Sequence, residues 1–139
     1  MDSPAVHLAV LVDDNEVDLF LQRRFIEINQ FAKEIREYSS PEEALDYLSS
    51  LTPEEFPDII FLDLNMPLMN GFEFLKRFEV LPSTQTLHSK IVVVTSSGHT
   101  NDRDRAYEHK SVFWFATKPF NTKNLDELRL KLIQSGVGA

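Results

Sequence analysis

Five apolar runs alternate with stretches of helical periodicity along this chain, and that alternation constrains its fold more than any other feature. Short runs rich in Val, Ile and Phe are typical of strands buried on both faces of a parallel sheet. Between them, apolar residues recur three or four positions apart, which indicates helices. We predict strands at Val6–Val12, Ile35–Tyr38, Ile59–Leu62, Ile91–Val94 and Val112–Ala116.

The intervening helices are predicted from apolar spacing and from start signals. A first helix over about residues 15–29 is indicated by Val17, Leu21, Phe25 and Ile28. A capping box with proline at the first helical position starts the second helix at Ser40, Pro41 and Glu43. Three further helices are predicted around Phe74–Phe78, Asp102–Glu108 and Leu125–Leu132, the last capped by Asn121 or Thr122.

A regular alternation of strands and helices predicts an α/β fold in which helices cover both faces of a parallel sheet. Five such units suit a flavodoxin-like (βα)5 three-layer sandwich with strand order 2-1-3-4-5. The length of 139 residues suits one domain, with a core over about residues 6–134 and short tails. In this topology a crevice opens between the first and third strands, at their carboxyl ends.

Composition excludes several classes of function. The net charge of −8 argues against a nucleic-acid partner, because binding to phosphates needs clustered Lys and Arg. The absence of cysteine excludes a disulfide framework and a thiolate zinc site. No signal peptide and no apolar stretch of membrane-spanning length is recognisable, so we expect a soluble, cytoplasmic protein without a membrane partner.

Polar residues stop four of the five predicted strands. Asp13 and Asp14 end the first strand, Asp63 the third, Thr95 the fourth and Lys118 the fifth. Each residue by itself could be a helix cap or a solvated strand end. Because the carboxyl ends of parallel strands share one edge of a sheet, we expect all five side chains to converge at the mouth of the crevice.

Such a cluster has a definite chemistry. Two carboxylates about 4 Å apart repel by roughly 4 kcal/mol at an effective dielectric of 20, so the cluster favours a divalent cation. Oxygen ligands without nearby His or Cys favour Mg²⁺. Asp63 beside a metal ion, Lys118 and Thr95 is arranged to attack an electrophilic phosphorus, and the expected product is an aspartyl phosphate.

At these residues the chain resembles the receiver domain of two-component response regulators. The matching motifs are "LVDDN", "FLDLNMPLMNG", "VVVTSS" and "TKPF", in that order, and the resemblance extends from about His7 to Ile133. It implies a signalling protein and not an enzyme in the usual sense, since a receiver catalyses only its own phosphorylation and slow dephosphorylation. The implied phosphodonor is a sensor histidine kinase or a histidine phosphotransfer protein.

The resemblance also implies roles for individual residues. Asp63 would accept the phosphoryl group, and Thr95 and Lys118 would bind its oxygens. Metal ligands would be Asp63 together with Asp13 (through water), Asp14 and the backbone carbonyl of Asn65. Thr95 would also act as a switch residue together with Phe115, which stands three positions before Lys118.

Other expectations concern partners and surfaces. The phosphodonor is expected to dock around Asn15, Asp18 and the turn at Pro119 and Phe120, because it must reach Asp63 in line. With no effector domain in view, we expect a stand-alone regulator, a monomer or weak dimer, that presents a phosphorylation-dependent surface to a downstream target protein. A phosphate shuttle is the alternative. The family's Gly-Ala before the fifth strand is replaced here by "EHKSVFWFA", which leaves the shape of that loop open.

Three rival functions share part of this pattern. Haloacid-dehalogenase-type phosphatases also combine Asp, Mg²⁺, Thr or Ser, and Lys, but they place a D-x-D nucleophile after the first strand, where this chain has Asp13 and Asp14. A binding module that has lost phosphorylation is disfavoured by the complete set Asp14, Asp63, Thr95 and Lys118. Nucleotide binding is disfavoured because no glycine-rich loop is present.

Overall fold

A single parallel sheet of five strands forms the centre of the molecule, with strand order β2-β1-β3-β4-β5. The computed structural model describes residues 4–66, 69–82, 86, 88–96, 100–118 and 120–135. Pro67, Pro119 and the C-terminal tail, on which some expectations fall, lie outside these ranges. The strands are β1 (Val6–Val12), β2 (Ala32–Tyr38), β3 (Ile59–Leu62), β4 (Lys90–Thr95) and β5 (Val112–Thr117).

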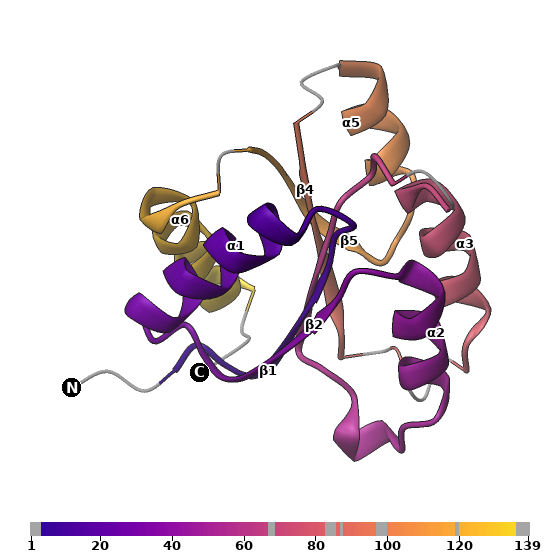
Figure 1. The fold of residues 1–139 in the computed structure, drawn as a ribbon, viewed down its shortest axis with the longest axis horizontal. Helices are drawn as coiled ribbons and strands as arrows, with labels where there is room; N and C mark the ends of the chain where they lie inside the picture. The colour runs from indigo at the N-terminus through magenta and orange to yellow at the C-terminus, as the bar shows by residue number, and fades with distance from the viewer. Residues whose placement is uncertain are drawn as a thin grey trace.

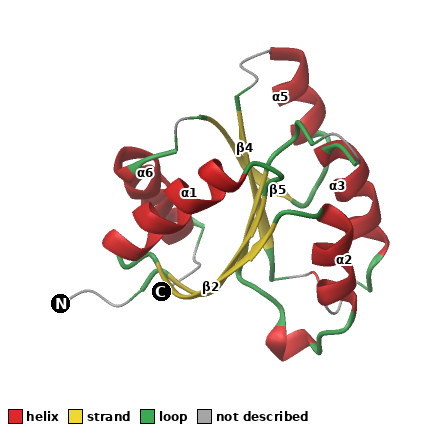
Figure 2. Ribbon diagram, viewed as in Figure 1, coloured by secondary structure: helices red, strands yellow, loops and turns green. Residues whose placement is uncertain are grey.

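Helices cover both faces of this sheet and make a three-layer sandwich, as Figures 1 and 2 show. On one face lie α1 (Glu16–Ile28) and α6 (Thr122–Gln134), and on the other lie α2 (Pro41–Ser49), α3 (Gly71–Val80) and α5 (Thr100–Tyr107). A short 3-10 helix, η1 (Pro53–Glu55), precedes β3. The predicted flavodoxin-like fold and strand order are therefore confirmed.

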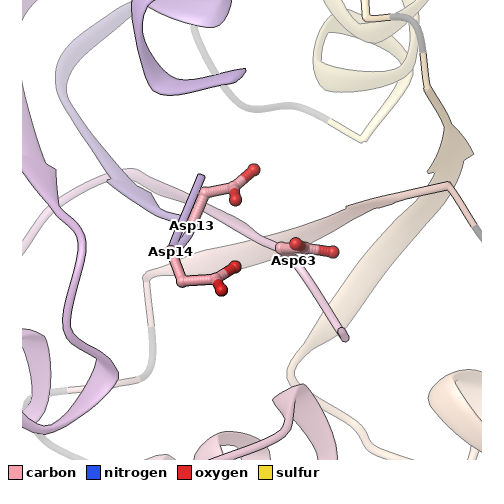
Figure 3. A group of neighbouring side chains, drawn as sticks. All are labelled: Asp13, Asp14 and Asp63. Carbon is pink, nitrogen blue, oxygen red and sulfur yellow. The ribbon is translucent and has the colours of Figure 1, made fainter. Parts of the chain in front are cut away.

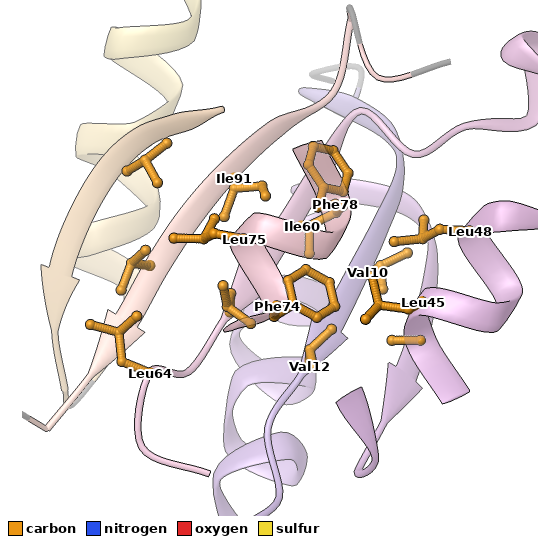
Figure 4. Close-up of a cluster of buried hydrophobic side chains, with 14 of the residues drawn as sticks. Val10, Val12, Leu45, Leu48, Ile60, Leu64, Phe74, Leu75, Phe78 and Ile91 are labelled. Carbon is orange, nitrogen blue, oxygen red and sulfur yellow. The ribbon is translucent and has the colours of Figure 1, made fainter. Parts of the chain in front are cut away.

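Two apolar cores, one on each face of the sheet, stabilise the layers. The core beneath α2 and α3 includes Val10, Ile60, Leu48 and Phe74, all of them fully buried (Figure 4). The core beneath α1 and α6 is built around Phe31 and Phe61, whose ring centroids lie 6.3 Å apart. Because β1 and β3 contribute alternate side chains to both cores, their backbones are held rigidly, and so are the loops at their carboxyl ends.

The helix starts agree with the signals in the sequence. Asn15, Ser40, Asn70 and Asn121 are the N-caps of α1, α2, α3 and α6, and each side chain accepts a hydrogen bond from a backbone amide of the first turn. Such caps satisfy amide groups that have no partner within the helix. None of the helices in the described part of the chain is long and apolar enough to span a membrane.

Most of the apolar residues that predict α1 do not face the core. Val17 is 66% exposed and Ile28 is 62% exposed, whereas Leu19, Gln22 and Ile26 form the buried face. The helix was predicted correctly, but of the four apolar residues used for the prediction only Phe25 packs against the core, and Val17, Leu21 and Ile28 are exposed. Contiguous patches of exposed apolar surface often mark sites at which another molecule binds.

The loop before β5 and the strand itself depart from regular geometry. Glu79 at the end of α3 accepts a hydrogen bond from Ser111 Oγ at 2.8 Å, and its other carboxylate oxygen lies 2.8 Å from His109 Nδ1. Within the strand, the register with β4 shifts by one residue at Phe113. This bulge turns Phe113 and Trp114 toward the core beneath α1 and α6, and Phe115 toward the core beneath α2 and α3.

Close backbone packing at the start of α3 shapes the loop that follows β3. Gly71 N donates to Leu64 O at 2.9 Å, which folds this loop back on itself. A Cβ atom at Gly71 would lie 2.7 Å from Leu64 Cα and 2.9 Å from Asp63 O, both of them backbone atoms. Glycine is therefore required here by space, and the loop that carries Asp63 depends on it.

We expect Gly71→Ala to lower the free energy of unfolding by about 1–3 kcal/mol, because overpacking against backbone forces the loop to shift. Urea denaturation measures this change. Lys76→Ala, at an exposed position of the same helix, is the matched control and should change stability by less than about 0.5 kcal/mol. Equal stability of Gly71→Ala and wild type would show that the loop relaxes freely.

Candidate functional site

The polar residues that end the strands meet at one edge of the sheet. Backbone pairing brings them together, since Asp63 N donates to Val12 O at 3.0 Å and Lys118 N donates to Thr95 O at 2.8 Å. Carboxylate oxygens of Asp13, Asp14 and Asp63 lie within 4.8 Å of one another (Figure 3). Asp13 and Asp63 are buried, and Asp14 is exposed at the rim.

Asp13 is held by donors on both of its carboxylate oxygens. Oδ1 accepts from Asn15 N at 2.9 Å, and Oδ2 accepts from Lys118 Nζ at 2.9 Å and from Gln22 Nε2 at 3.3 Å. The site therefore includes Gln22, which the sequence reasoning missed. The available signal was a polar residue between the buried positions Leu19 and Ile26 of α1.

The Asp63 carboxylate accepts fewer hydrogen bonds than the Asp13 carboxylate within the described residues. Its Oδ1 accepts from Asn65 N at 3.2 Å, and its Oδ2 lies 3.5 Å from Lys118 Nζ, beyond a good charged hydrogen bond. Burial, followed by the negative charge of Asp13, raises the pKa of Asp63 to about 6, although Asn65 N and Lys118 act in the opposite direction. Without a further cation, the fold opposes ionisation of this carboxyl group.

Lys118 is the cation shared by these carboxylates. Its Nζ lies 2.6 Å from Asp18 Oδ2, 2.9 Å from Asp13 Oδ2 and 3.5 Å from Asp63 Oδ2, and its side chain is 15% exposed. Burial lowers the pKa of Lys118, but the hydrogen bonds to Asp18 and Asp13 outweigh burial, so the pKa lies above its ordinary value. The ammonium group is thus charged at any physiological pH.

Thr95, the last residue of β4, is linked to the loop that follows β3. Its side chain is fully buried, and its Oγ1 accepts a hydrogen bond from Asn65 Nδ2 at 3.0 Å. Asn65 therefore contacts Asp63 through its backbone and Thr95 through its side chain. A change at Asp63 can reach β4 by this route.

The remaining expected residues lie away from the carboxylates. Phe115 is half-buried on β5, and its backbone amide donates to the Tyr107 hydroxyl of α5 at 3.0 Å. Phe120 is only 4% exposed and packs on Phe61 with ring centroids 5.2 Å apart. The ring of Phe120 therefore belongs to the core beneath α1 and α6. Docking of a phosphodonor at the turn of Pro119 and Phe120 stays a prediction, since Pro119 lies outside the described residues.

The arrangement fits a hard divalent cation. Three carboxylates face one ammonium group that is already shared, so the cluster carries excess negative charge. Burial, and after it the negative charge of Asp13, raises the pKa of Asp63. Oxygen donors without thiolate or imidazole suit Mg²⁺ better than a transition metal.

We expect Asp63→Asn to stabilise the metal-free protein at pH 8. A pKa raised from 3.8 to about 6 means that this group favours folding below pH 4, and that the contribution is lost as the pH rises through 6. The ionised carboxylate therefore costs roughly 2–3 kcal/mol at pH 8. Thermal unfolding in EDTA should give the variant the higher melting temperature, by a margin that shrinks between pH 6 and pH 4.

Asp46→Asn is the control, since Asp46 is an exposed acid of α2. It should leave the melting temperature nearly unchanged throughout this pH range. If Asp63→Asn melts at or below the wild-type temperature at pH 8, the ionised Asp63 carboxylate does not destabilise the metal-free fold, and the prediction is wrong.

Known proteins that resemble this chain share one family. The family model of the response regulator receiver domain matches residues 9–129. Stress response regulator protein 1 of Meyerozyma guilliermondii is 31% identical over 113 residues, which cover 81% of this chain and 49% of that protein. The PhoB transcriptional regulatory protein of Escherichia coli is 34% identical over 87 residues, 61% of this chain and 37% of that protein. The chain thus spans about half or less of the length of these curated relatives.

Solved structures agree with the sequence relatives. A two component response regulator from Cytophaga hutchinsonii superposes with a TM-score of 0.84 at 26% identity, over 93% of this chain and 98% of that one. A response regulator receiver protein from Dyadobacter fermentans gives 0.83 at 27%, over 92% and 96%. These matches set aside the phosphatase alternative. With a receiver-family model over most of its length and the same fold as solved receivers, the chain belongs to the response regulator receiver domain family of two-component signalling.

Proposed function

We propose that this chain accepts a phosphoryl group on Asp63 from a histidine phosphodonor and thereby switches a protein-interaction surface. The observation that supports this proposal most directly is a buried carboxylate at the end of β3 beside an acidic pair and Lys118. Its pKa of about 6 leaves most Asp63 carboxyl groups ionised at pH 7.5, and therefore nucleophilic. The family membership supports the same chemistry.

The proposed step is a direct transfer. A carboxylate oxygen of Asp63 forms the new O–P bond while the P–N bond to the donor imidazole breaks, and its electron pair stays on that nitrogen. Lys118 supplies an ammonium group close to Asp63, where negative charge on the phosphoryl oxygens develops. The fold contributes position and charge, which are the main catalytic factors in phosphoryl transfer.

Mg²⁺ is the proposed cofactor. Asp14 and Asp63 would hold it with the carbonyl of Asn65, and Asp13 would act through water. When bound, the ion offsets the charge of the carboxylates and of the incoming phosphoryl group. Asp13 already bonds three donors, which suits an outer position better than direct ligation.

The proposed readout runs through Thr95 to β5. A phosphoryl group adds two negative charges or nearly so, and three acceptor oxygens. Thr95 Oγ1 accepts from Asn65 Nδ2 in the resting protein. A hydroxyl group can also donate a hydrogen bond, and in this proposal the hydroxyl of Thr95 donates to a phosphoryl oxygen after phosphorylation. Movement of Thr95 would alter the packing of Phe115 and hence its backbone bond to Tyr107 on α5.

The phosphodonor is proposed to dock on α1. Val17, Phe20 and Leu21 are exposed apolar side chains near the start of this helix, which begins beside Asp13. Apolar exposure of this kind suits a helical protein such as a histidine kinase or a histidine phosphotransfer protein. Such an exchange implies a cytoplasmic site of action. A phosphate shuttle would use the same residues, with a second histidine protein as the acceptor.

Asp63 is predicted to be the sole phosphoacceptor. Incubation with acetyl phosphate and Mg²⁺ should add about 80 Da, the mass of one phosphoryl group, to the wild type and nothing to Asp63→Asn, because the only activated oxygen has been removed. Intact-mass spectrometry measures the adduct. Asp58→Asn is the control, since Asp58 is a strand-edge acid at the other end of β3 and should leave the adduct intact. A stoichiometric adduct on Asp63→Asn would refute the assignment.

Fluoroberyllate, a stable phosphoryl mimic, should reveal the readout. Amide shift changes are expected at Thr95, which pairs with Thr117 of β5, and across residues 100–118, where the bond from Phe115 N to Tyr107 joins β5 to α5. In Thr95→Ala the mimic should still bind, but the changes at Phe115 and Tyr107 should be lost. Changes confined to the acidic cluster in the wild type would rule out this output face.

A further inference from the structure

Lys118 lies closer to an acid of α1 than to the proposed phosphoacceptor. We propose that Asp18 is a positioning residue, which holds the Lys118 ammonium in a resting place, and that phosphorylation requires the ammonium to leave Asp18 for the phosphoryl oxygens. The distances are 2.6 Å from Nζ to Asp18 Oδ2 and 3.5 Å from Nζ to Asp63 Oδ2. This inference rests on the proposed phosphorylation of Asp63.

The position of Asp18 is fixed by the start of α1. Asn15 caps this helix and accepts a hydrogen bond from Asp18 N at 3.1 Å. Asn15 N in turn donates to Asp13 Oδ1, which ties the first turn of α1 to the end of β1. Leu19, the next residue, is buried in the core beneath α1 and α6. The Asp18 carboxylate is therefore presented to the site from a rigid element.

The hydrogen bonds of Lys118 show how its charge is divided. An ammonium group has three N–H donors, and here Nζ donates to Asp18 at 2.6 Å and to Asp13 at 2.9 Å. Its distance to Asp63 is too long for a good charged hydrogen bond. In the resting protein, Lys118 is therefore hydrogen-bonded to Asp13 and Asp18. It only partly neutralises the charge of Asp63, the residue that must react.

A phosphoryl group on Asp63 changes this balance. It offers three strong acceptor oxygens and nearly two negative charges, whereas Asp18 offers one charge that is partly exposed to water. The Lys118 side chain has four flexible carbons, so its ammonium can move while β5 stays in place. Asp18 touches no reacting atom, and its effect is exerted through Lys118.

Phosphorylation by acetyl phosphate tests this role without any docking partner. In the reaction an Asp63 oxygen bonds to phosphorus, and the P–O bond to acetate breaks with its electron pair on acetate. Asp18→Asn should raise the initial rate of adduct formation about two- to fivefold, the effect that a partly exposed ion pair supports. Intact-mass time courses at a fixed Mg²⁺ concentration measure it.

Glu16→Gln is the matched control, because Glu16 is an exposed acid in the same turn that forms no ion pair within the described residues. It removes the same charge from the approach of an anionic donor. A rate increase equal to that of Asp18→Asn would overturn the proposal, since general repulsion would then explain both.

A double-mutant cycle provides the second test. In a Lys118→Ala background, followed over long incubations with acetyl phosphate, Asp18→Asn should change the rate of adduct formation no more than Glu16→Gln does. If the wild type forms its adduct normally and Asp18→Asn forms it at the same rate, the role of Asp18 is overturned but the proposed function is not. A wild type that gains no adduct would overturn the proposed function and this inference with it.

Discussion

The bonds of one ammonium group connect the first and last strands of this sheet. Lys118, directly after β5, binds Asp13 at the end of β1 and Asp18 on α1, and it lies near Asp63 at the end of β3. Because the ammonium is largely withdrawn from water, these interactions are stronger than those of an exposed pair. Asp13, Asp18 and Asp63 are all positioned around this cation. In the proposed mechanism, the response of the site depends on where the cation moves.

The same cluster weakens the metal-free fold. Burial and the charge of Asp13 raise the pKa of Asp63, so the protein holds an ionised carboxylate that its surroundings oppose. The two apolar cores, which grip β1 and β3 from both faces, supply the stability that tolerates this arrangement. Local strain of this kind is typical of functional sites, and here it prepares the site to gain from a bound cation.

The core packing also explains which faces are free. Phe120 packs on Phe61 in the core beneath α1 and α6, so the ring of Phe120 is not part of the exposed surface. The apolar residues Val17, Phe20 and Leu21 of α1 point away from this core. The surface of α1 beside the acidic cluster therefore combines these apolar side chains with the exposed acid Glu16, while the Asp18 carboxylate binds Lys118.

The order of apolar runs determined the parallel sheet, its strand order and the edge at which Asp13, Asp63, Thr95 and Lys118 meet, since alternation and chain connectivity leave few other arrangements. Helix starts could also be predicted from nearby sequence, because each capping side chain bonds a backbone amide two or three residues away. Contacts between distant residues were decided only by the tertiary structure. Gln22 reaches Asp13, Asp18 reaches Lys118 across 100 positions of sequence, and the bulge at Phe113 sets the direction of Phe115. Such contacts depend on how helices pack on the sheet, and periodicity alone does not specify that packing.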